Sequence, residues 1–490
     1  MKHYIDIPQV INYKDMLKNY YSFSSNTYKQ LIMKNNNVKT LKECLERDLK
    51  RSDLGCEVGS SAYVKKSKYC FIKSRALQKY SFLPNFEKSA SEYIIPQAFI
   101  NMNLKENDVI ISKDSNIGEV IILDKDYPNT MLSGALYKLP IKKNKFYILS
   151  IIKHDIFKQQ LDFLVPKGAT IRHAKTLFLD CKIPFPKNNI EQTIAFVEKI
   201  TKSIINKEKL IRKRHEQITN LIQEELVNNQ KKDKFIYKEP TIKDLEENAR
   251  LDTGIHSKDF KYIEFLVKNY KNGYFFIDNE NIKSGNTPEI RYISDYENLP
   301  YKWLTPTHFN SYGNIIIDEY IRHKKTNNIK NDCILLVNRG DGIDCGKSMF
   351  YCFKDFGLGH HNQGLYKVFG YDTARLIFIL CFLNTNFMRK YCGLLTTGSK
   401  MKELKIEHFL TIPFPNFTSK KQQEISNLYY NPNIDIDYKM VKLDNFDNID
   451  NEFCKNAGIY NLDKNIKYLK KILNSTIDKI INEEDINIRF

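Results

Sequence analysis

Polar loops carry the side chains of this 490-residue chain that could do chemistry. Two glycine loops, 167–173 and 396–402, combine backbone N–H groups with hydroxyl and cationic side chains, a mixture suited to binding phosphate. Two further loops, 112–116 and 338–342, each follow a short apolar run and present Ser, Asn, Lys or Arg, the residue types that read base edges. The loops are therefore predicted to contact DNA.

The predicted DNA-contacting residues are cationic, hydroxyl and amide residues, together with the loop glycines. In the first half of the chain they are Lys65, Lys66, Lys68, Lys73, Arg75, Ser112, Lys113, Asn116, Lys167, Gly168, Thr170, Arg172 and His173. In the second half they are Asn338, Arg339, Lys347, His361, Asn362, Thr397, Gly398, Ser399, Lys400 and Lys402. Residue type alone does not separate base-reading from phosphate-binding side chains.

Catalytic motifs are incomplete. The run from Gly393 to Lys400 resembles a phosphate-binding P-loop, but its Ser and Lys stand in reverse order. The segment 360–362 (His-His-Asn) lacks a cluster of acidic metal ligands, and 403–405 (Glu-Leu-Lys) covers only part of a nuclease motif. We therefore predict no catalytic residue, no metal site and no cofactor bound by this chain.

The charge balance favours a polyanionic partner. The chain has 76 Lys+Arg against 58 Asp+Glu, a net charge of +18, which favours nucleic acid first and an anionic membrane second; plain solubility is the alternative. Because no run of 18 apolar residues and no signal-peptide core occurs, we expect a cytoplasmic protein with no membrane partner. The ten cysteines contain no C-x-x-C pair, which indicates reduced, mostly buried thiols.

An internal repeat organises the chain. The segments 182–186 (Lys-Ile-Pro-Phe-Pro) and 411–415 (Thr-Ile-Pro-Phe-Pro) are 229 residues apart, as are Tyr137 and Tyr366. Five such matches occur in the same order, at offsets between 224 and 231. A period of this length predicts a whole domain plus a connector in each copy.

Each copy is expected to be a mixed domain of strands followed by a late helix, so the fold class is α/β (mixed α+β). Each is predicted to begin at a polar stretch, 51–54 or 250–253. Short runs rich in β-branched and aromatic residues predict strands at 69–72, 109–111 and 120–123 in the first copy, and at 274–277, 315–317 and 333–337 in the second. The late helices are predicted at about 145–164 and 371–392.

A long helix is predicted between the copies. Residues 190–228 lack Gly and Pro, and their apolar residues recur at intervals of three and four. Thr201, Glu208 and His215 interrupt this seam, which favours long antiparallel paired helices over an extended coiled coil. The expected partner is 462–480, which has a second apolar seam; two ordinary amphipathic helices, each docked on its own domain, are the alternative.

The expected domains are an N-terminal helical arm (1–50), a first basic domain (51–189), the long helix (190–234), a second basic domain (235–418) and a C-terminal helical region (419–490). The arm has no counterpart in the second copy, and its helix, at about 13–34, is expected to complete the second connector, which the Asn- and Asp-rich segment 431–460 interrupts. Lys+Arg exceed Asp+Glu by 22 to 13 in 51–189 and by 22 to 17 in 250–418, so both domains are expected to face DNA.

The duplicated ending of the two domains resembles that of the DNA specificity subunits of type I restriction-modification systems. In the first copy the matching residues are Thr170, Ile183, Pro184, Phe185, Pro186, Glu191 and Gln192. In the second they are Ser399, Ile412, Pro413, Phe414, Pro415, Gln422 and Gln423. Residues 107–118 also resemble the strand and turn that precede the family's recognition loop. The resemblance covers about 50–430.

The resemblance implies two homologous target recognition domains, each reading one half of a split double-stranded DNA sequence. The paired helices would set the spacing and dock two methyltransferase subunits, which would bind S-adenosylmethionine, while a separate motor-nuclease subunit would cut DNA. Three alternatives stay open: a recognition subunit of another methylation-based defence system, a self-sufficient endonuclease with a divergent site, and a helical scaffold whose basic domains bind protein.

Overall fold

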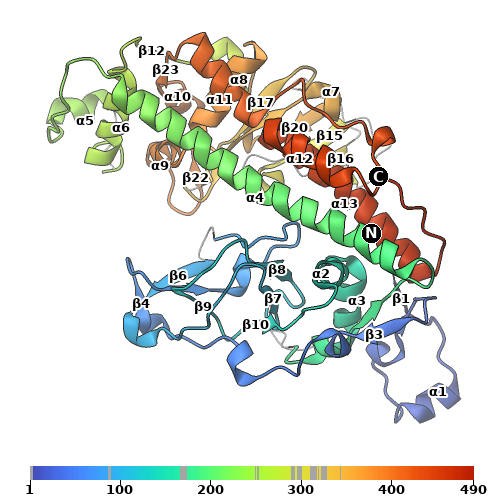
Figure 1. Cartoon of the computed structure of the whole chain (residues 1–490). Coiled ribbons are helices and arrows are strands. Elements are labelled where there is room, and N and C mark those ends of the chain that lie inside the picture. The colour runs from blue at the N-terminus through green and yellow to red at the C-terminus, as the bar shows by residue number, and fades with distance from the viewer. Residues whose placement is uncertain are drawn as a thin grey trace. The chain divides into compact units, whose positions relative to one another are not determined.

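The computed structural model contains two compact units, each built from helices and strands (Figure 1). It describes residues 4–86, 90–165, 174–248, 250, 253–287, 293–294, 301–309, 317, 319–321, 328–342 and 344–490. The first unit comprises 1–209, 436–455 and 464–490, and the second comprises 210–435 and 456–463. The mixture of helices and strands confirms the predicted fold class.

The two larger sheets of the first unit have three and four strands. One has the antiparallel order β10 (Leu136–Leu139), β7 (Val109–Ser112) and β8 (Val120–Ile122). The other has the order β4 (Tyr63–Val64), β6 (Ser91–Ile94), β5 (Cys70–Ile72) and β9 (Thr130–Leu132), with β5 and β9 parallel. Every residue of β7, β8 and β9 is buried, which explains why these runs are mostly apolar rather than alternating between apolar and polar residues.

The second unit repeats this topology. Its antiparallel sheet has the order β13 (Ile282–Ser284), β21 (Leu365–Val368), β17 (Cys333–Val337) and β19 (Ser348–Tyr351). Its other sheet has the order β14 (Ile293–Ser294), β16 (Tyr320–Ile321), β15 (Tyr301–Leu304) and β20 (Gly359–His361), with β15 and β20 parallel. The sheets with the parallel pair have the same arrangement in both units. If their four strands are numbered by sequence, their order across each sheet is 1-3-2-4. The shared order confirms the internal repeat.

Two equivalent glycines show where the copies begin. The N–H of Gly55 donates to the carbonyl of Leu136, and the N–H of Gly285 donates to that of Leu365. A Cβ on either glycine would lie 2.1 Å from a backbone carbonyl oxygen, so no other residue fits there without a backbone shift. The counterpart of 51–55 is therefore 281–285, and the predicted start of the second copy at 250–253 is wrong.

One strand of the first 50 residues has a counterpart in the second copy. The strand β3 (Val38–Thr40) pairs with β11 (Lys182–Pro184), and β12 (Tyr274–Phe275) pairs with β23 (Phe414–Pro415). Each Pro-Phe-Pro segment is thus covered by a strand that precedes its own domain, and the predicted lack of a counterpart is wrong. The predicted helix at about 13–34 is wrong beyond α1 (Tyr13–Lys18), because β2 (Gln30–Leu31) follows and pairs with β1 (Ile5–Asp6).

The predicted strands and late helices are largely present. The strands at 69–72, 109–111, 120–123 and 333–337 are confirmed, 274–277 is reduced to β12, and residues 315 and 316 lie outside the described residues. Each late helix is a pair: α2 (Lys145–Lys153) with α3 (Asp155–Leu164), and α8 (Thr373–Leu383) with α9 (Asn386–Leu395). His154 and Thr385 cap the second helix of each pair, so the breaks occur without Gly or Pro.

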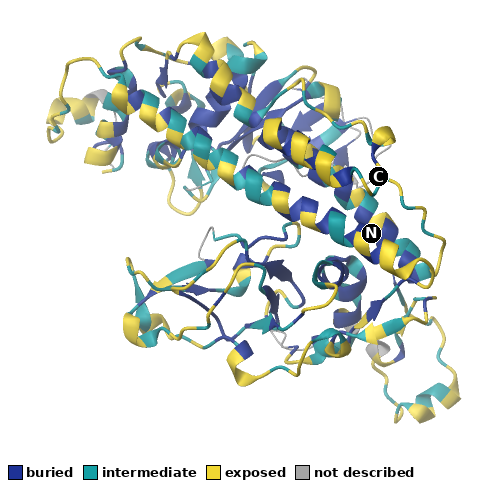
Figure 2. Cartoon of the chain, in the orientation of Figure 1, coloured by how far each residue is buried: buried dark blue, intermediate teal, exposed yellow. Residues whose placement is uncertain are grey.

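The long helix α4 (Ile190–Asn228) confirms the predicted connector. At 1.5 Å per residue it is about 60 Å long, and its apolar seam is buried while its other face is exposed (Figure 2). In the first unit it runs antiparallel to α13 (Ile459–Asn482), because Glu208 pairs with Lys470 and, beyond the start of α4, Lys187 pairs with Glu483. The predicted antiparallel pairing of helices is thus confirmed.

The C-terminal region is interrupted as predicted. The helix α11 (Ser419–Tyr429) ends before a polar segment, and α12 (Phe446–Asn456) precedes α13. Seven of the ten cysteines are buried and all ten are free thiols. Within the described residues, no helix is both long enough and apolar enough to span a membrane.

Candidate nucleic-acid interface

In the second domain, the two predicted DNA-contacting loops form one short ribbon. The strand β18 (Arg339–Gly340) pairs antiparallel with β22 (Lys402–Glu403). Thr397 and Glu403 exchange both of their backbone hydrogen bonds, at 2.9 and 2.8 Å, and so close a hairpin loop of residues 398–402. The structure therefore brings Arg339 together with Thr397, Gly398, Ser399, Lys400 and Lys402.

The conformation of the hairpin loop requires its glycine. Gly398 has φ +99°, and a Cβ there would lie 2.3 Å from the carbonyl oxygen of Met401. The turn leaves Ser399, Lys400 and Met401 exposed, with Met401 63% accessible. Sequence reasoning missed Met401 because methionine is usually a core residue. Its place between two lysines in a glycine loop was the available signal.

The cations of this ribbon differ in how far they are already paired within the protein. The Nε and Nη2 atoms of Arg339 both donate to Oε1 of Glu403, at 2.9 and 2.7 Å. The Nζ of Lys347 lies 3.5 Å from Oδ1 of Asp344. Lys400 is exposed, Lys402 is half-buried, and neither forms an ion pair with a described residue. These two lysines are the cations most available to phosphate.

The corresponding loop of the first domain is shorter. Gly118 (φ +78°) follows residues 113–117, whereas its counterpart Gly346 (φ +87°) follows 338–345, so the second loop has three more residues. Both glycines allow close packing, because a Cβ would lie 2.4 Å from Leu161 in the first case and 2.7 Å from Cys392 in the second.

The residues that follow the two glycine loops are hydrogen-bonded at equivalent positions. The N–H of Ala174 donates to the carbonyl of Lys113, as the N–H of Leu404 donates to that of Asn338. In the first copy, Lys167, Gly168, Thr170, Arg172 and His173 lie outside the described residues. Of the shorter loop, Asn116 is exposed, while Lys113 pairs with Asp114.

Three predicted DNA-contacting side chains are buried, so they present almost no surface to a ligand in this structure. Ser112 and His361 have no exposed surface and Asn338 is 1% exposed. The Ser112 hydroxyl donates to the carbonyl of Asp114 at 2.7 Å, and the Asn338 amide donates to the carbonyl of Gln363 at 3.1 Å. Burial, assisted by the charge of Lys367, lowers the pKa of His361 to about 3, so its ring is neutral and offers phosphate no charge.

The remaining predicted residues lie on other turns. Asn362 accepts a hydrogen bond from the N–H of Gly364 at 3.0 Å and so shapes the turn between β20 and β21. Lys73 pairs with Glu92 at 2.9 Å. Four exposed cations lie shortly before or after β5 in the sequence: Lys65, Lys66, Lys68 and Arg75. Of the predicted residues of the first domain that the structure describes, the exposed cations therefore lie near the four-stranded sheet.

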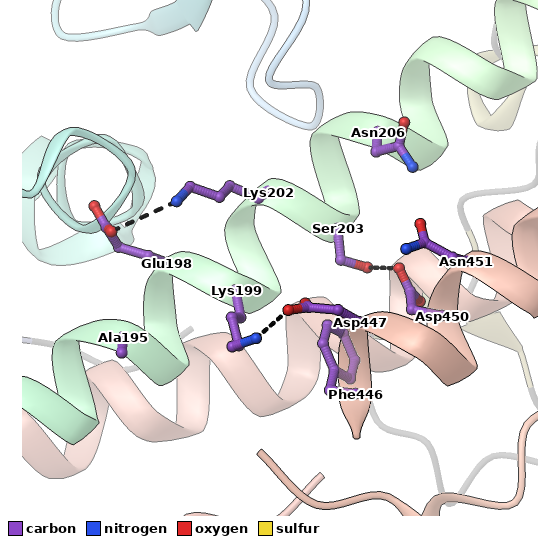
Figure 3. Close-up of a pocket in the computed structure, with 10 residues that line it drawn as sticks. All are labelled: Ala195, Glu198, Lys199, Lys202, Ser203, Asn206, Phe446, Asp447, Asp450 and Asn451. Atoms are coloured by element: carbon purple, nitrogen blue, oxygen red, sulfur yellow. Dashed lines mark hydrogen bonds and ion pairs between the residues drawn. The ribbon is translucent and has the colours of Figure 1, made fainter. Parts of the chain in front are cut away.

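A separate groove of about 390 Å³ lies between α4 and α12 in the first unit (Figure 3). Lys199 pairs with Asp447 across it, and the Ser203 hydroxyl donates to Oδ2 of Asp450 at 2.8 Å. Lys207 is fully buried, donates to the Ser203 hydroxyl at 2.6 Å and pairs with Asp450. Because its charges are of both signs and paired, the groove has no net attraction for phosphate, unlike the ribbon.

The comparisons with known proteins come from solved structures, since no family model and no curated protein matches the chain. The chain is similar to the S subunit of a type I restriction-modification system from M. genitalium, with a TM-score of 0.40 and 14% identity over 93% of this chain and 98% of that chain. It is also similar to a chain from a type I R-M system studied for complex assembly and conformational transition (TM-score 0.28, 12% identity, 91% and 98% covered). The HsdS subunit from Thermoanaerobacter tengcongensis is a third similar structure (TM-score 0.27, 12% identity, 92% and 97% covered). These structures come from type I restriction-modification systems, the systems whose specificity subunits the duplicated motifs of this chain resemble.

Proposed function

We propose that this chain is the DNA specificity subunit of a type I restriction-modification complex, in which each domain reads one half of a bipartite DNA target. The observation that carries the proposal is the duplicated topology: one domain fold occurs twice, and a single 39-residue helix connects the copies. Two copies of one recognition fold suit two half-sites. A continuous helix of about 60 Å suits a fixed distance between them.

The ribbon of the second domain supports DNA as the ligand. The major groove of B-DNA admits a two-stranded β-ribbon, and β18 and β22 form one. Lys400 and Lys402 supply cations for phosphate, while Ser399 supplies a hydroxyl that can bond a base edge. The first domain offers exposed lysines at 65, 66 and 68 for the same purpose.

The proposal assigns the chemistry to partner subunits. Two methyltransferase subunits would dock on the paired helices, bind S-adenosylmethionine and methylate adenine. A motor-nuclease subunit would cut DNA, and this chain would carry neither activity and bind no cofactor. This division of labour follows from the family resemblance of the duplicated motifs.

A methylome tests the proposal. Cells that express the chain together with the methyltransferase subunit of its own genome should methylate adenine in a split sequence with a fixed spacer, and cells that express the methyltransferase subunit alone should not. A contiguous methylated sequence, or none, would contradict the proposal. Site-specific cleavage of plasmid by the purified chain with Mg²⁺ would instead support the endonuclease alternative.

A further inference from the structure

Two carboxylates of α4 hold the first recognition domain by its backbone. Oε1 of Glu198 accepts a hydrogen bond from the N–H of Phe146 at 3.2 Å. Oε2 of Glu208 accepts from the N–H of Phe82 at 2.9 Å and from the hydroxyl of Ser81 at 2.9 Å. Each bond joins the helix to the domain, and each has a charged acceptor, which makes it stronger than a neutral one.

The contact at Glu208 also includes the partner helix. Oε1 of Glu208 lies 3.1 Å from Nζ of Lys470 on α13, and the same Nζ donates to the carbonyl of Tyr80 at 2.6 Å. The Glu208 side chain is only 11% exposed. Because water is largely excluded there, the ion pair and the hydrogen bonds are less screened than at the surface.

The second contact lies at the start of a helix. Phe146 is in the first turn of α2, where backbone N–H groups have no partner within the helix and where a carboxylate is electrostatically favourable. The Nζ of Lys202, one turn further along α4, lies 4.9 Å from the centre of the Phe146 ring. Glu198 therefore caps α2 from outside the domain.

The spacing of the two carboxylates explains what they achieve together. Ten residues of helix separate them by about 15 Å. A single attachment would allow the domain to rotate about it in any direction, whereas two attachments to rigid backbone leave only rotation about the line that joins them. The ion pair of Lys209 with Glu106, at 2.6 Å, adds a third contact, but it is more exposed and so weaker. Glu208 thus interrupts the apolar seam because it faces the domain as well as α13.

We propose that Glu198 and Glu208 are positioning residues that fix the orientation of the first recognition domain on α4, and thereby narrow the range of half-site spacings that the protein accepts. This inference rests on the proposed bipartite reading of DNA. It concerns how the domain is held, and not which bases it reads, so the half-site sequences should not depend on either carboxylate.

The test compares three variants of the full chain, each co-expressed with the methyltransferase subunit. Substrates are plasmids whose half-sites are separated by the natural spacer or by a spacer one or two base pairs longer or shorter. In Glu198→Ala/Glu208→Ala, the preference for the natural spacer should fall at least about tenfold, which is the loss expected for even one of the three charge-assisted hydrogen bonds removed. Glu198→Gln/Glu208→Gln keeps an acceptor at each position and should lose less. Glu216→Ala removes an exposed carboxylate from the same helix and should behave as wild type.

Hydrogen exchange on the full chain without DNA gives a second measurement. In the double alanine variant, the N–H groups of Phe82 and Phe146 should exchange faster, while those of β7 and β8 should not change. If the double alanine variant does not fold, the Glu198→Gln/Glu208→Gln variant is the test, and a smaller loss of preference for the natural spacer is expected. Spacer preference as sharp as that of wild type in the folded variants would overturn this inference. A wild-type chain without bipartite methylation would instead refute the proposed function.

Discussion

The two repeated domains share the order of their sheets and differ in their loops. Both have the same strand order in the sheet that contains the parallel pair, and both place a glycine, Gly55 or Gly285, against backbone carbonyls at equivalent positions. Their turns before Gly118 and Gly346 differ by three residues, and the longer one pairs with the glycine loop as β18 and β22. The comparison teaches that the buried, paired strands keep the same arrangement in both domains, whereas the solvent-exposed loops can differ in length without destabilising the core.

A second difference lies inside the shared core. Leu132 pairs with Ile72 between β9 and β5, and His361 pairs with Leu304 between β20 and β15. Leu132 and His361 are both fully buried. The second domain therefore holds a titratable ring where the first has a leucine, and we expect acid to destabilise the second domain through that ring.

Exchange of a whole domain should have the largest effect. If residues 51–189 are replaced by the corresponding domain of another specificity subunit, one half of the methylated sequence should change completely and the other half should remain. The reason is that each copy carries its own sheets and loops. A methylome of cells with the hybrid chain measures this, and a change in both halves, or in neither, would show that the domains do not read independently.

Replacement of Gly55 or Gly285 by alanine should destabilise the domain that contains it. Gly55→Ala and Gly285→Ala each place a Cβ 2.1 Å from a backbone oxygen, so each should lower the free energy of unfolding by about 3 kcal/mol. Urea unfolding of the full chain measures this. Gly59→Ala is the matched control, since its Cβ would meet nothing closer than the Ser61 hydroxyl at 3.6 Å. Equal stability of Gly55→Ala and the control would contradict the close packing at Gly55, and a large difference between Gly55→Ala and Gly285→Ala would contradict the equivalence of the two glycines.

Acid should destabilise the second domain through His361. Its folded-state pKa of about 3 lies below the value of about 6.5 in an unfolded chain, so between these values only the unfolded chain binds the proton. The free energy of unfolding is therefore unaffected by this ring well above pH 6.5, and it decreases as the pH falls from about 6.5 towards 3. At pH 5 the loss is about 2 kcal/mol.

His361→Leu, which copies Leu132 of the first domain, should remove that loss. Unfolding free energies of the variant and the wild type at pH 7 and pH 5 give the comparison. The reciprocal change Leu132→His should introduce the same pH dependence into the first domain. If the wild type and His361→Leu lose stability in parallel on acidification, the buried ring does not control acid stability.

Single cations on the ribbon should have the smallest effect. Lys400→Ala and Lys402→Ala should each reduce the slope of log affinity for DNA against log salt by about 1, one phosphate contact each. Arg339→Ala should reduce it less, because Arg339 already pairs with Glu403. Fluorescence anisotropy with duplex DNA over a range of salt concentrations measures the slopes. A larger effect of Arg339 would show that it leaves Glu403 to bind DNA.

Local patterns in the sequence determined the repeat, the long helix and the buried strands. The helix α4 occupies the predicted residues 190–228, because a recurring apolar seam in a segment without Gly or Pro specifies a helix from neighbouring residues alone. The strands β7, β8 and β17 follow in the same way from apolar runs that no other local structure would bury.

Only the tertiary structure decided the remaining features, because they depend on pairs of residues that are distant in the chain. The strand β3 forms against β11, more than 140 residues away, so a local pattern could not distinguish it from the predicted helical arm. Ser112, Asn338 and His361 have side chains typical of DNA contact, yet the packing of other segments buries them. Glu208 interrupts an apolar seam in the sequence, and only the folded chain shows that its carboxylate meets Phe82, Ser81 and Lys470. Burial and long-range hydrogen bonding are properties of the assembled fold, and no single segment encodes them.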